Sequence, residues 1–111
     1  NLEAAPDLAR HSLELAEDAN MPFERGVTLR VLGCLARARG ETAQSEEYLH
    51  QSLGILRGLG ARYEVGRTLV QLAVLTRICN RPIDAQHDLE EAIAIFEQAG
   101  APVDLEQARR L

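Results

Sequence analysis

The feature that most constrains this chain is an internal repeat with a period of 40 residues. Aligning residues 21–60 with residues 61–100 gives ten identical pairs, among them Gly26/Gly66, Leu32/Leu72 and Gly60/Gly100. A fixed period of this length is typical of repeat architectures, in which each unit buries its apolar face on its neighbours. We therefore predict a single array over residues 1–111. It consists of a partial repeat (1–20, a second helix), two full repeats (21–60 and 61–100) and another partial repeat (101–111, a first helix).

Each full repeat has the pattern of two helices. Apolar residues recur at helical spacing in the first half of each repeat, at Leu29, Leu32, Leu35 and Ala36 in one and at Leu69, Leu72 and Leu75 in the next. Gly or Asn follows each predicted helix (Gly40, Gly60, Asn80, Gly100), where a left-handed C-terminal residue is favoured. Linkers of three or four residues require antiparallel neighbours. The sequence predicts an all-α solenoid of antiparallel helix pairs, with about six helices at 3–19, 23–39, 43–59, 63–79, 83–99 and 103–111.

The placement of small residues in these helices resembles the tetratricopeptide repeat (TPR). The matching positions are Leu32-Gly33-x-x-Ala36 and Leu72-Ala73-x-x-Thr76 in the first helices, with Ser45, Leu49 and Ser52, then Ala85, Leu89 and Ala92, in the second. The period is 40 rather than the usual 34, an aromatic first position is missing, and so is the closing Pro. This longer form is similar to repeat arrays of bacterial signalling ATPases, nucleotide cyclases and transcriptional regulators. The resemblance implies a right-handed solenoid whose first helices line a concave groove.

The resemblance also implies which side chains face that groove. The first-type helices carry more positive charge than the second-type helices, which are acidic. A groove that mixes Arg and apolar residues suits a peptide with acidic or carboxylate groups, although ordinary surface charge is the alternative explanation. The residues that the family pattern assigns to the groove are Val27, Arg30, Cys34, Arg37, Arg67, Val70, Val74, Arg77 and Ile78.

Catalytic and metal-binding patterns are weak. Asp84, His87 and Glu91 have a spacing that suits a metal ion, but a solvated acidic helix face has the same pattern. Ser12, Ser45 and Ser52 occupy packing positions rather than the strained turn of a hydrolase nucleophile. A phosphate-binding loop needs a Lys, which the chain does not have. We expect no catalytic residues, no metal and no cofactor. Cys34 and Cys79 are expected to be small packing residues rather than a redox pair.

The net charge and the cysteine content limit which partners and which compartment we expect. The net charge of -5 argues against nucleic acid or an anionic membrane as a direct partner. Two cysteines without a paired motif favour a reducing compartment, which we take to be the cytoplasm. The sequence thus predicts a protein–protein interaction scaffold, part of a larger bacterial signalling protein or transcriptional regulator, that binds a peptide or protein. The alternative is a structural module that forms homo-oligomers through open terminal repeat faces, and an enzyme is not expected.

Overall fold

The fold is given by a computed structural model that describes residues 5–18 and 21–111. Within these residues the chain forms six α-helices and no strand, so the predicted all-α helical repeat class is confirmed. No described helix is long and apolar enough to cross a membrane. The helices are α1 (Ala5–Asp18), α2 (Pro22–Ala38), α3 (Thr42–Gly58), α4 (Arg62–Ile78), α5 (Pro82–Ala99) and α6 (Pro102–Arg110).

The helices from α2 onward begin one residue before the predicted positions, and four of these five also end one residue early. Three of them start on a proline, at Pro22, Pro82 and Pro102. Proline suits the first turn because its missing N–H has no partner to lose there, so these residues belong to the helices rather than to the linkers. The first predicted helix, 3–19, includes positions outside the described residues.

The helix ends follow the predicted glycine signals. Gly40, Gly60 and Gly100 have φ values of 78°, 69° and 65°, and Asn80 adopts the same left-handed conformation at 59°. After α2 the amide of Glu41 donates to the Ala36 carbonyl over 2.9 Å, which is the hydrogen bond of a Schellman C-cap. Within each unit, the ends at Gly40, Asn80 and Gly100 turn the chain sharply enough to bring the next helix back antiparallel.

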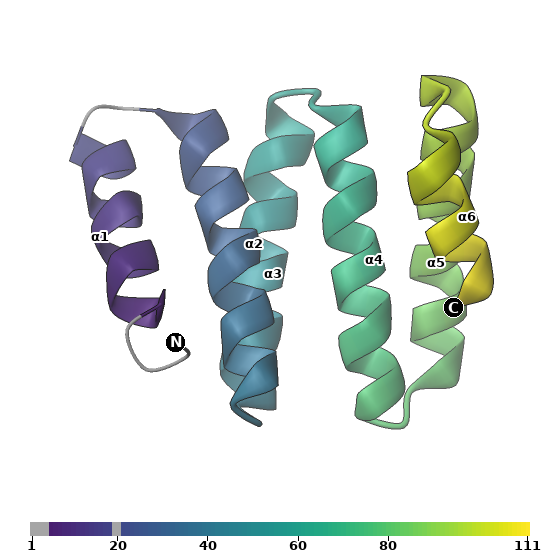
Figure 1. The fold of residues 1–111 in the computed structure, drawn as a ribbon, viewed down its shortest axis with the longest axis horizontal. Helices are drawn as coiled ribbons and strands as arrows, with labels where there is room; N and C mark the ends of the chain where they lie inside the picture. Colours follow the sequence, from purple (N-terminus) through teal and green to yellow (C-terminus); the bar gives the residue numbers. More distant parts are fainter. Residues whose placement is uncertain (1–4, 19–20) are drawn as a thin grey trace. The chain divides into compact units, whose positions relative to one another are not determined.

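The described residues form two compact units, which divide between Gly60 and Ala61. In the first unit α2 and α3 pack side by side along their length (Figure 1). They approach each other closely at Gly33, where a Cβ atom would lie 2.6 Å from Leu49 Cγ. The hydroxyl groups of Ser45 and Ser52 donate hydrogen bonds of 2.7 Å to the carbonyls of Gly33 and Gly26. Small residues therefore allow close packing here and also link the two helices.

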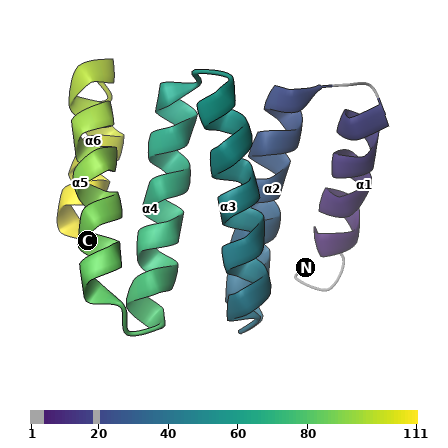
Figure 2. The same ribbon diagram turned by 180° about the vertical axis from the view of Figure 1, so that it is seen from behind.

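In the second unit α4 packs against α5, and α6 packs against α5 (Figure 2). The equivalent contact positions hold Ala73, Ala85 and Ala92, which are at most 2% exposed. A Cβ atom on Gly66 would lie 2.8 Å from the Phe96 ring. Close packing is kept in this unit, whereas the serine hydroxyls of the first unit have no counterpart at Ala85 and Ala92. It remains a prediction that the whole chain forms one array and that this array is a right-handed superhelix.

Candidate protein-binding surface

One face of α4 carries the five groove residues that the sequence assigns to the second full repeat. They line two hollows within the second unit. The hollow that we call the Arg67 hollow has a volume of about 100 Å³ and is lined by Arg67, Val70, Gln71, Phe96, Asp104 and Gln107. The second, called the Arg77 hollow, has a volume of about 140 Å³ and is lined by Ala73, Val74, Arg77, Ile78, Leu89 and Leu111. The structure thus brings Arg67 together with Val70, and Arg77 together with Val74 and Ile78.

The Arg67 hollow is lined mainly by polar residues, and two of them, Arg67 and Asp104, contact neighbouring side chains. The Arg67 guanidinium lies 5.8 Å from the centre of the Tyr63 ring and 3.8 Å from a Glu64 oxygen. The Tyr63 hydroxyl donates a hydrogen bond of 2.7 Å to Asp104. This hydrogen bond, followed by desolvation and the Asp104 charge, raises the pKa of the Tyr63 phenol above its ordinary value. These contacts tie α4 to α6 and hold the Arg67 guanidinium beside an aromatic ring.

The Arg77 hollow is mainly apolar. Its side chains come from α4, from Leu89 of α5 and from Leu111, and Arg77 donates a hydrogen bond to the Leu111 carbonyl. Ile78 is 61% exposed, and Ile83, at the start of α5, is 83% exposed. An apolar hollow with a guanidinium at its edge can bury an aliphatic side chain and bind a carboxylate next to it.

The groove residues assigned to α2 are less accessible. Val27, Cys34 and Arg37 are half-buried, and Arg30 is only 7% exposed although a groove residue was expected to project outward. Burial raises the pKa of the Cys34 thiol, while the positive charges of Arg37 and Arg30 act in the opposite direction. Of the nine predicted residues, those on α4 therefore offer the more open surface.

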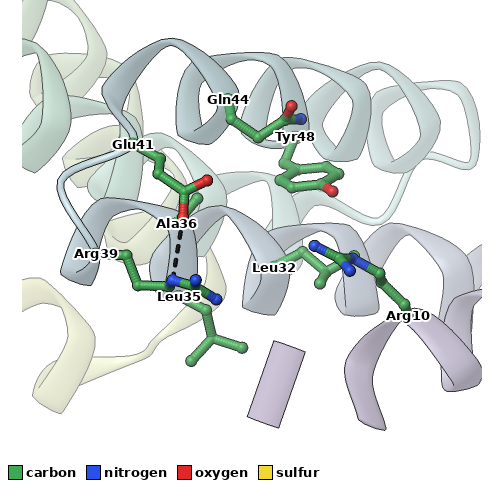
Figure 3. A pocket seen from close by; sticks show the side chains of 8 residues that line it. All are labelled: Arg10, Leu32, Leu35, Ala36, Arg39, Glu41, Gln44 and Tyr48. Atoms are coloured by element: carbon green, nitrogen blue, oxygen red, sulfur yellow. Dashed lines mark ion pairs between the residues drawn. The ribbon is translucent and has the colours of Figure 1, made fainter. Parts of the chain in front are cut away.

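The sequence reasoning missed a hollow in the first unit, which lies between α1, α2 and α3 (Figure 3). Its volume is about 90 Å³. In the sequence, this hollow is indicated by a difference between the two repeats. The second repeat has other residue types at the positions of Arg39, Gln44 and Tyr48. We call it the Tyr48 hollow, and its lining residues are Arg10, Leu32, Leu35, Ala36, Arg39, Glu41, Gln44 and Tyr48.

No group of three or more His, Cys, Asp or Glu side chains in the described part of the chain is placed to hold a metal ion. Asp84 and His87 are exposed on α5, and Glu91 is half-buried on the same helix. Cys34 is half-buried and Cys79 is exposed, and neither of the two is in a disulfide bond.

The chain resembles part of a bacterial protein. It is 30% identical over 109 residues to the regulatory protein AfsR of Streptomyces griseus, and the match covers 95% of this chain. The chain spans 11% of the length of that relative. No family model matches the chain. The comparison therefore relates these helices to a segment of a regulatory protein.

Proposed function

We propose that the chain is a protein-interaction module of a larger bacterial regulatory protein and that it belongs to the tetratricopeptide repeats. The 40-residue period, the antiparallel helix pairs and the similarity to a segment of AfsR support this proposal. The module binds a peptide or protein in the cytoplasm and carries out no catalysis. Its regulatory output, through transcription or signalling, comes from other parts of that larger protein rather than from direct contact of these helices with nucleic acid.

The observation that carries the proposal is the pair of hollows along α4. Arg67 and Arg77 are ten positions apart, which corresponds to about 15 Å along a helix. An extended peptide covers that distance in about five residues. Its two terminal carboxylate side chains then reach the two guanidinium groups, and an aliphatic side chain at the middle position, which points to the same face of the peptide, enters the Arg77 hollow. Charge-assisted hydrogen bonds orient the peptide, while burial of the aliphatic group adds affinity.

A peptide-display selection from a random library tests this function. The immobilised protein should enrich peptides in which an aliphatic residue lies two positions from an acidic one. The double variant Arg67→Glu with Arg77→Glu should not enrich them, because its carboxylates repel acidic partners. A matched change of charge outside the hollows, Arg57→Glu, should leave the enrichment as it is. Recovery of the same peptides by the α4 double variant would refute the proposed surface.

Self-association is a second candidate, because large apolar side chains are exposed in both units. Leu8 on α1 is 68% exposed, and in the second unit Ile83 and Val103 are 83% and 67% exposed. Exposed apolar patches favour association. Under this alternative, sedimentation equilibrium shows a mass that rises with concentration, and Ile83→Glu or Val103→Glu reduces it. A constant monomer mass at millimolar concentration would exclude it.

A further inference from the structure

The Tyr48 hollow combines an apolar floor on α2 with polar walls from α1, from α3 and from the linker between α2 and α3. Leu32, Leu35 and Ala36 of α2 form the floor, and Leu32 and Ala36 are only 3% and 6% exposed. Figure 3 shows the Arg10 guanidinium and the Tyr48 hydroxyl on one side of the hollow, with Arg39 on the other. The hollow therefore offers hydrogen-bond donors above a surface that suits a short hydrocarbon stem.

The two arginines already have carboxylate neighbours, but these pairs are exposed. Arg39 Nε lies 3.1 Å from Glu41, and Arg10 Nη1 lies 3.7 Å from Asp7. All four side chains are at least 45% exposed, and ion pairs of this kind contribute little to stability. A guanidinium carries five N–H donors, so each arginine has more donors than its one pair uses. Both arginines can therefore donate hydrogen bonds to a ligand at little cost in free energy.

Comparison of the two repeats shows which residues of the Tyr48 hollow the helix pair requires for folding. The floor positions Leu32 and Leu35 correspond to Leu72 and Leu75, which are both buried. The wall positions differ completely, because Arg39, Gln44 and Tyr48 correspond to Cys79, Asp84 and Asp88. The second unit therefore folds the same helix pair without any of these donors. Packing alone does not account for the donor set in the first unit.

From this geometry we propose that the Tyr48 hollow binds a carboxylate on a short aliphatic stem. The donors are the guanidinium groups of Arg10 and Arg39, the amide of Gln44 and the hydroxyl of Tyr48. The volume of about 90 Å³ is smaller than the cavity of about 150 Å³ that holds benzene in an engineered protein. A propionate-sized group matches it. Such a group occurs at the end of a glutamate side chain and in small free carboxylic acids.

Heteronuclear NMR titrations with two acidic probes test this site and distinguish the sources. The probes are propionate and a blocked Ala-Glu-Ala tripeptide, and their neutral controls are propionamide and blocked Ala-Gln-Ala. Both acidic probes should shift the Gln44 side-chain amide saturably at millimolar concentrations, while the neutral controls should not. Tighter binding of the tripeptide assigns the site to a protein side chain, and equal or tighter binding of propionate assigns it to a free carboxylate.

Variants establish that the hollow itself binds the probes. Arg10→Gln and Arg39→Gln should each weaken binding about tenfold, because each removes a charge-assisted hydrogen bond. Arg57→Gln removes the same charge elsewhere in the first unit and should leave binding unchanged. Arg77→Glu should also leave it unchanged, which separates this site from the α4 surface. The absence of a saturable shift, equal shifts with the neutral controls, or full affinity in the Arg10→Gln and Arg39→Gln double variant would overturn the proposal.

Discussion

The two cysteine residues differ in their surroundings, and this difference predicts their reactivity. Burial raises the pKa of Cys34 and reduces access to it, whereas Cys79 is exposed at the end of α4. The thiolate is the reactive form, so Cys79 should react first with a thiol reagent near neutral pH and Cys34 much more slowly. With a thiol reagent that releases a chromophore, the absorbance should therefore rise in two phases, a fast one from Cys79 and a slow one from Cys34. The variant Cys79→Ser should keep only the slow phase, and a fast reaction of that variant would contradict the described burial.

Tyr63 links α4 to α6 through Asp104 and should make stability depend on pH at the alkaline end. Because the hydrogen bond raises its pKa in the folded state above the ordinary value of 10.0, the unfolded chain loses the phenol proton first. The stabilisation is therefore fully present below the ordinary pKa and is lost as pH rises through the folded value. In a Tyr48→Phe background the phenolate absorbance reports Tyr63 alone. Asp104→Ala should move this titration to lower pH, and an unchanged titration would show that the bond is not formed.

At the scale of the helices, two glycines in the first unit should respond oppositely to alanine. Gly33 lies against Leu49, which is fully buried, and an added Cβ would come within 2.6 Å of it. Gly33→Ala should reduce the free energy of unfolding by about 1 to 3 kcal/mol. Gly54 is exposed inside α3 with nothing within 4 Å of an added Cβ, so Gly54→Ala should increase it by up to about 1 kcal/mol. Chemical denaturation measures both, and a neutral Gly33→Ala would contradict the described helix contact.

The helix pairs could be predicted because their signals are local or periodic. Gly40 and Asn80 mark helix ends through backbone conformation, and the 40-residue period shows that Gly33 and Ala73 occupy equivalent positions. Gly54 lies inside the predicted helix 43–59, and the structure shows open space around it. The hydrogen bonds of Ser45 and Ser52 to carbonyls of α2 were not predictable, because a small residue at a contact position does not reveal which group its hydroxyl meets.

The candidate sites were only partly predictable for a related reason. The family pattern selected the α4 residues that line the two hollows, although it says nothing of the contacts that Arg67 makes with Tyr63 and Glu64. The Tyr48 hollow is lined by residues of α1 as well as of α2 and α3, and the repeat pattern does not show which side chains meet there. Its donors come from positions where the two repeats differ, whereas the search for periodicity selects positions where they agree.

At the scale of the whole molecule, we propose that α4 binds a peptide with acidic and aliphatic side chains. The most direct measurement is the fluorescence anisotropy of a labelled Glu-Ala-Ile-Ala-Glu peptide titrated with the protein, with Gln-Ala-Ile-Ala-Gln as the neutral control. The acidic peptide should bind saturably, more weakly as salt increases, and at least about tenfold more weakly to Arg77→Glu than to Arg57→Glu. Equal affinity of the two peptides, or of the two variants, would contradict the account.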